Sequence, residues 1–145
     1  MTKLIDKDIY AKIVEQIPIL CVDLVIERED GHFLTVKRVN EPLKDEFWVP
    51  GGRVMRNEKL LDAAKRIAKQ EIGFIIDDLW FYGMYEGFFK KSAANMKSGI
   101  HTVSAVFSFK VGINRATRVE LDEQSSSYKW ARALPVDFIN NTKRL

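Results

Sequence analysis

The sequence contains a single cysteine, Cys21, among its 145 residues. One cysteine cannot form an internal disulfide, so nothing in the chain requires an oxidising compartment. Cys21 lies in the apolar stretch from Ile17 to Val22, which favours a buried strand cysteine over a nucleophile.

Long hydrophobic runs are also missing. No segment approaches the ~20 consecutive apolar residues of a membrane span, and Asp23 interrupts the best candidate. The first eight residues hold no apolar core of signal-peptide length. We therefore expect a cytoplasmic protein that has no membrane as a partner.

Charge of one sign is in small excess, because 23 lysines and arginines against 20 aspartates and glutamates give a net charge of +3. This balance suits a small anionic ligand and gives no support to a nucleic-acid partner, since nucleic-acid binders concentrate basic charge in patches. With 46% hydrophobic and 30% charged residues, the composition excludes a disordered or collagen-like chain. No repeat or flexible linker divides the sequence, so its length predicts one domain over residues 1–145.

Apolar residues recur at helical and strand spacing along the chain. The central helix is expected over residues 58–72, with Asn57 as its N-cap and Gly73 as its C-terminal stop. Its apolar stripe is formed by Leu61, Ala64, Ala68 and Ile72. We expect further helices over residues 6–17 and 134–140, strands over residues 20–27, 33–38, 79–89, 102–111 and 128–130, and a basic loop over residues 90–99. This mixture predicts a layered α/β or α+β sandwich.

The segment from Gly52 to Phe74 carries the most informative pattern. Five residues separate Gly52 from Glu58, seven separate Glu58 from Arg66, and Glu71 and Gly73 follow in register. The spacing resembles the Nudix box, a loop–helix–loop that presents carboxylates to a divalent cation, which in turn holds a diphosphate. The resemblance implies an α/β/α sandwich with a mixed sheet. Two roles are open for Arg66: binding the diphosphate, or forming a structural ion pair with Glu58.

Two glutamates of the box are replaced in this chain, by Ile67 and Gln70, and Glu71 remains. Positions three and four apart share one helix face, so a face that carries three carboxylates in the family carries one here. We therefore expect one cation per subunit rather than a cluster. Hard oxygen ligands favour Mg²⁺ or Mn²⁺.

Three further stretches, residues 37–42, 48–54 and 121–124 followed by 128–130, resemble the GDP-mannose mannosyl hydrolase branch of this superfamily. By match with that branch, the metal ligands would be Gly51, Glu71 and Gln124. Arg53 and Arg66 would neutralise the leaving diphosphate, Arg38 would help to bind the substrate, and Asp23 would contact the sugar. The resemblance also implies a homodimer formed through the N-terminal portions of two copies.

In that branch, water attacks the anomeric carbon and releases the sugar and a nucleoside diphosphate. The family's base is a histidine directly after Asp-Glu-Gln, and Ser125 stands there in this chain. His101 is the candidate for a replacement base. Three functions remain open: hydrolysis of a nucleoside diphosphosugar such as GDP-mannose, cleavage of a diphosphate at phosphorus, and a weakly catalytic binding or accessory role in sugar-polymer synthesis.

Overall fold

The computed structural model describes residues 4–93 and 97–145. Its strands are β1 (Ile19–Arg28), β2 (Phe33–Arg38), β3 (Phe47–Trp48), β4 (Gly51–Arg53), β5 (Trp80–Phe89), β6 (Ile100–Val111), β7 (Ser125–Ala131) and β8 (Thr142–Arg144). Its helices are α1 (Lys7–Gln16), α2 (Leu60–Ile72), α3 (Ile113–Ala116) and α4 (Val136–Asn140). No helix in these two ranges is long and apolar enough to cross a membrane. Residues 94–96 of the predicted basic loop lie outside the described part.

The strands form one mixed sheet in the order β3-β2-β1-β6-β5-β8, with β4 paired to β1 and β7 paired to β2. β1 and β6 run parallel at its centre, in a register from Ile19 opposite Thr102 to Arg28 opposite Val111. Alternation along β1 divides its side chains between the two faces. Val22, Leu24 and Ile26 face one apolar cluster, and Val25 faces the other.

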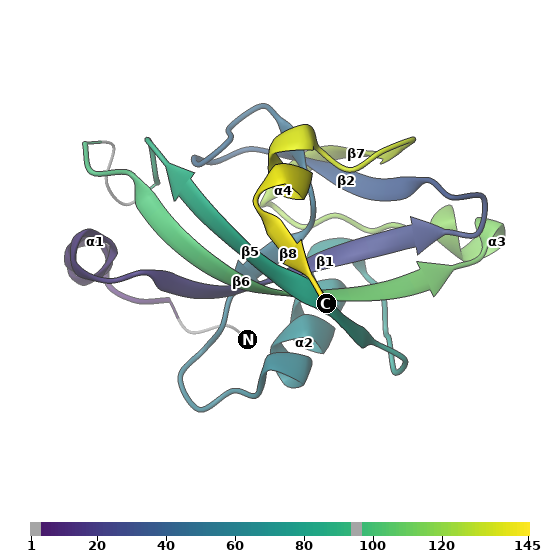
Figure 1. The fold of residues 1–145 in the computed structure, drawn as a ribbon, viewed down its shortest axis with the longest axis horizontal. Coiled ribbons are helices and arrows are strands. Elements are labelled where there is room, and N and C mark those ends of the chain that lie inside the picture. Colours follow the sequence, from purple (N-terminus) through teal and green to yellow (C-terminus); the bar gives the residue numbers. More distant parts are fainter. Residues whose placement is uncertain (1–3, 94–96) are drawn as a thin grey trace.

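A helix covers each face of the sheet (Figure 1). On one face, α2 packs through Ala63, Ala64, Ile67, Ala68 and Ile72. On the other face, Phe138 of α4 packs against Trp48 and Tyr85. The predicted α/β/α sandwich with a mixed sheet is therefore confirmed.

The start of α2 differs from the prediction. The helix begins at Leu60 with Lys59 as its N-cap. Asn57 precedes this cap with a φ of 66°, a left-handed conformation that asparagine tolerates better than most residues. Gly73 ends the helix as predicted, with a φ of 76°. Leu61 is 48% exposed and does not belong to the apolar stripe, which takes in Ile67 instead.

The last predicted strand is longer than expected and begins at Ser125 rather than Tyr128. The serine run has low strand propensity, but pairing with β2 places Ser125 opposite Arg38. The short strands β3, β4 and β8 were not expected. β4 matters for function because it sets Gly51 opposite Asp23 on β1.

Candidate active site

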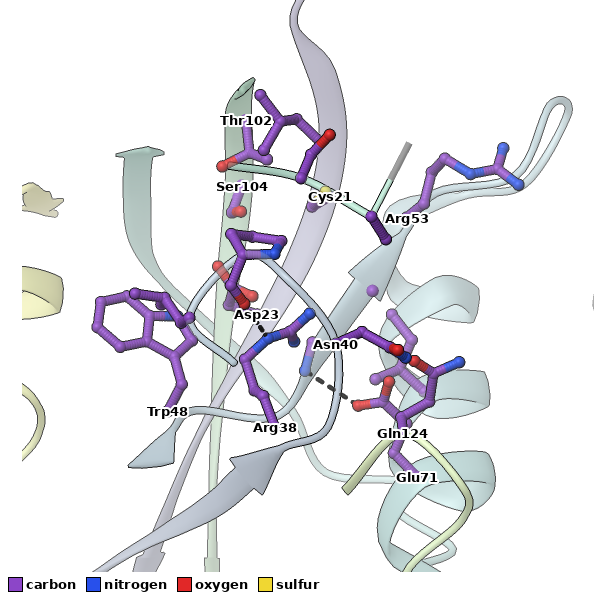
Figure 2. A pocket seen from close by; sticks show the side chains of 18 of the residues that line it. Cys21, Asp23, Arg38, Asn40, Trp48, Arg53, Glu71, Thr102, Ser104 and Gln124 are labelled. Atoms are coloured by element: carbon purple, nitrogen blue, oxygen red, sulfur yellow. Dashed lines mark hydrogen bonds between the residues drawn. The ribbon is translucent and has the colours of Figure 1, made fainter. Parts of the chain in front are cut away.

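A cavity of about 880 Å³ opens between the start of α1, the segment after β2, β4 and the end of α2. Figure 2 shows some of the side chains that line it. The structure brings seven of the predicted site residues to this one cavity: Asp23, Arg38, Gly51, Arg53, Arg66, Glu71 and Gln124. His101 does not line it.

Glu71 projects into the cavity from the last turn of α2, and its Oε2 accepts a hydrogen bond of 3.1 Å from the Gly51 N–H (Figure 2). Burial raises the pKa of Glu71 to about 8, and the negative charge of Asp122 adds to this effect. Arg38 acts in the opposite direction but does not offset burial. The protein therefore does not fully offset the free-energy cost of the charged form of Glu71.

Gly51 separates Glu71 from a second acid, Asp23 on β1. A Cβ at position 51 would collide with the Asp23 carboxylate and with the Val22 carbonyl oxygen. Only glycine fits at this close approach of two strands. Gly51 therefore allows both carboxylates to border one cavity.

Asp23 is buried, and burial raises its pKa to about 6. A hydrogen bond from the Ser104 hydroxyl and the positive charge of Arg38 both favour its charged form. Ser104 and Thr102 border the same part of the cavity from β6. This group of one acid and two hydroxyls can exchange hydrogen bonds with a polyhydroxylated ligand.

Arg38 lies at the end of β2, and its Nε donates a hydrogen bond of 2.6 Å to the Pro42 carbonyl (Figure 2). The contact ties the guanidinium to the segment that follows β2. The positive charge of Arg38 lowers the pKa values of both Asp23 and Glu71, so this arginine favours the charged form of each acid.

Arg66 forms a two-point ion pair with Glu58, at 2.7 Å from Nε to Oε2 and 2.9 Å between the second pair of atoms. It also donates a hydrogen bond of 2.9 Å to the Arg53 carbonyl. The alternative that the sequence left open, an ion pair with Glu58, is therefore present. Arg66 holds the backbone of β4 while its side chain borders the cavity.

Arg53 is oriented differently, because its guanidinium carbon lies 5.6 Å from the centre of the Tyr10 ring. Tyr10 belongs to α1 and borders the cavity. The sequence does not indicate this role of Tyr10, because a single aromatic residue in an amphipathic helix does not predict which distant strand it contacts.

Gln124 belongs to the segment that precedes β7. Its N–H donates a hydrogen bond of 3.0 Å to Asp122 Oδ1, and its carbonyl accepts one of 3.1 Å from Val39. Figure 2 shows the Gln124 side chain beside Glu71. Asp122 and Glu123 also line the cavity. The sequence pattern indicates no role for these two acids, although they directly precede a predicted metal ligand.

His101 stacks on Phe88, with 4.3 Å between ring centres and 21° between ring planes. Thr102 and Ser104 border the cavity, so alternation along β6 turns residue 101 to the opposite face. Ser125, at the position of the family's base, does not line the cavity either. The described residues around the cavity thus include no histidine.

The donors beside Glu71 fit a divalent cation of the hard class. Glu71, Asp122 and Gln124 would each bind a cation through an oxygen atom, which matches the preference of Mg²⁺ and Mn²⁺. Within residues 4–93 and 97–145, no three His, Cys, Asp or Glu side chains are grouped closely enough to hold a metal by themselves. Ile67 explains part of this, because it is 1% exposed and packs in the core beneath Gly52. A cation here would need phosphate or water oxygens to complete its ligands.

Comparison with known proteins identifies the fold family. Residues 18–139 match the family model of the NUDIX domain. The chain is 34% identical over 128 residues to the low-salt glycan biosynthesis protein Agl8 of Haloferax volcanii, covering 88% of this chain and 80% of that protein. It is also 34% identical over 90 residues to an ADP-ribose pyrophosphatase of Methanocaldococcus jannaschii, covering 62% of this chain and 49% of that protein, about half its length. A MutT protein from Methanosarcina mazei Go1 has the same fold, with a TM-score of 0.68, 21% identity, and coverage of 86% of this chain and 91% of that chain.

Proposed function

Because the chain belongs to the NUDIX domain family, we propose that it hydrolyses a nucleoside diphosphosugar, GDP-mannose or a relative, by attack of water at the anomeric carbon. The products would be the free sugar and a nucleoside diphosphate. The observation that carries the proposal is a single cavity with a cation-suited carboxylate, Glu71, and a buried hydroxyl-binding acid, Asp23, on either side of Gly51.

Each end of the cavity has a chemical counterpart in such a substrate. Arg38 and Arg53 would bind the diphosphate, because guanidinium groups present paired N–H donors to phosphate oxygens. Asp23, with Ser104 beside it, would accept hydrogen bonds from sugar hydroxyls. The 34% identity to a glycan biosynthesis protein supports a sugar-containing substrate.

The cation would be held by Glu71 and Gln124, with Gly51 beside them. When bound, a divalent cation neutralises charge on the leaving diphosphate. Attack at carbon makes this charge neutralisation the main demand on the site, whereas attack at phosphorus also requires an activated water beside the metal. One principal carboxylate meets the first demand better than the second.

Product analysis tests the proposal. The protein would be incubated with GDP-mannose and Mg²⁺ in ¹⁸O-labelled water, and the products would be separated and their masses measured by mass spectrometry. ¹⁸O in GDP would mean attack at its phosphorus, whereas free mannose together with unlabelled GDP supports attack at carbon. Mannose phosphate together with GMP contradicts it and establishes cleavage at phosphorus, the activity named for the Methanocaldococcus relative.

One observation favours a second candidate, a diphosphosugar-binding or accessory protein with weak catalysis. The described residues around the cavity include no histidine, so the base expected from the GDP-mannose mannosyl hydrolase branch is missing there. Tight binding of GDP-mannose without turnover above the uncatalysed rate would support this candidate over hydrolysis.

A further inference from the structure

The N-terminal helix contributes part of the wall of the cavity. Leu4, Ile5 and Tyr10 border it, although α1 lies outside both the sheet and the Nudix box. Within α1, Ile9 is 55% exposed, whereas its neighbour Tyr10 is half-buried and turned toward the cavity. Tyr10 is therefore placed to act on a group inside the cavity.

That group is the Arg53 guanidinium, which lies over the Tyr10 ring at 5.6 Å from the ring centre. This distance is within the range of a cation–π contact. The backbone of Arg53 is fixed separately, by pairing of β4 with Cys21 on β1 and by the hydrogen bond from Arg66 to its carbonyl. Tyr10 thus supplies the orientation of the side chain, which backbone pairing leaves open.

The group that contacts each arginine determines whether its N–H donors are available to a ligand. Arg66 gives its N–H donors to Glu58, and Arg38 gives its Nε to the Pro42 carbonyl. Among the described residues, the guanidinium of Arg53 forms no ion pair with a carboxylate. An aromatic face attracts a cation through the π electrons, so it orients the guanidinium without occupying the N–H donors. A carboxylate at the same place would use those donors and cancel the charge.

We propose that Tyr10 is a positioning residue, which holds the Arg53 guanidinium at the cavity with its N–H donors available to a diphosphate. The inference rests on the proposed function only in taking a diphosphate as the ligand. It does not depend on which bond is cleaved or on which sugar is attached.

The test is a double-mutant cycle measured by calorimetric titration with inorganic pyrophosphate and with GDP, both in the presence of Mg²⁺. Tyr10→Leu should weaken binding of both ligands by about 2- to 5-fold, the range of a partly exposed cation–π contact. Tyr10→Phe keeps the ring and should bind like the wild type. In the Arg53→Ala background, Tyr10→Leu should cause no further loss, because the ring then has no cation to orient. Thermal unfolding of each variant checks that it is folded.

Equal losses in Tyr10→Phe and Tyr10→Leu would overturn the inference, because they would assign the effect to the phenol hydroxyl. A loss from Tyr10→Leu that persists in the Arg53→Ala background would also overturn it, because Tyr10 would then act on the ligand directly or through the stability of α1. Pyrophosphate contains neither a sugar nor a nucleoside, so the expected cycle with pyrophosphate upholds the inference even if GDP-mannose is not hydrolysed. A wild-type protein that binds no diphosphate would overturn both proposals.

Discussion

The Gly51 N–H donates a hydrogen bond to Glu71, and the same glycine leaves room for the Asp23 carboxylate on its other side. One residue without a side chain thus brings two acids to one cavity. Burial raises the pKa of both acids, to about 6 for Asp23 and about 8 for Glu71, so the charged form of each costs free energy in the unliganded protein. Ligand-binding groups that destabilise the unliganded protein are a common trade-off between stability and activity.

Glu71→Gln is therefore expected to stabilise the protein when no metal is present. A carboxyl whose pKa rises from 4.5 to about 8 on folding binds its proton more tightly in the folded state. Its contribution to stability is therefore present below pH 4.5 and is lost as the pH rises toward 8. In EDTA at pH 8, the variant should unfold with a free energy higher by on the order of 2 kcal/mol, and at pH 4.5 the difference should vanish.

Addition of Mn²⁺ provides the functional half of the same experiment. The wild type should gain thermal stability as Mn²⁺ saturates the site, and Glu71→Gln should gain far less. Asp62→Asn serves as the control, because Asp62 is an exposed acid in the first turn of the same helix. Equal gains in the wild type and in Glu71→Gln would show that Glu71 is not the metal ligand.

Gly51→Ala should destabilise the protein, because its methyl group would collide with the Asp23 carboxylate and a backbone carbonyl. Overpacking of this kind typically costs about 1–3 kcal/mol, to be measured by urea unfolding. The matched control is Gly112→Ala. Its Cβ would meet only Glu29, at 3.6 Å, so its stability should be unchanged or slightly higher. A stable Gly51→Ala protein would mean that β1 and β4 separate more easily than this packing implies.

The sequence predicts the Nudix helix better than it predicts the contacts of single residues. Gly52, Glu58, Arg66, Glu71 and Gly73 are close in the chain, so their spacing alone defines a local element. The contact between Tyr10 and Arg53 joins segments that only the tertiary fold brings together. His101 is a candidate base from the sequence, and only the strand register shows that it lies on the face of β6 opposite to Thr102, which lines the cavity.

Arg66→Lys should weaken the loop before α2, because lysine cannot keep both contacts with Glu58 and the bond to the Arg53 carbonyl. The pair is largely shielded, with 21% and 16% of its two side chains exposed. A loss of about 1–3 kcal/mol in unfolding free energy is expected, together with weaker binding of GDP. Arg56→Lys is the control, since Arg56 is exposed and forms no ion pair among the described residues, so its substitution should matter little. Equal effects of the two substitutions would contradict a supporting role for Arg66.

The resemblance to the GDP-mannose mannosyl hydrolase branch predicts a homodimer, and exposed apolar side chains at the start of the chain are where its interface is expected. Ile9 and Ile17 are 55% and 56% exposed, and Leu20 follows at 46%. Light scattering at micromolar concentration should give twice the monomer mass, and the double substitution Ile9→Lys with Ile17→Lys should give the monomer. Ile139→Lys alters an equally exposed residue on α4 and should leave the mass unchanged. A monomeric wild type would reject the prediction.

Ser125→His should raise the rate of GDP-mannose hydrolysis, because it restores an imidazole at the position of the family's base. Ser125 directly follows Gln124 and lies opposite Arg38 on β2, so a longer side chain there can extend toward the cavity. A general base contributes about 10²–10⁴-fold, and an imidazole without an orienting partner should give less than the full range. The gain should fall mainly on kcat and depend on a group that titrates near the histidine range. Ser126→His is the matched control, because Ser126 is exposed and has no opposite residue on β2, so an imidazole there should give no gain. Vigorous turnover by the wild type that Ser125→His leaves unchanged would show that another group already accepts the proton.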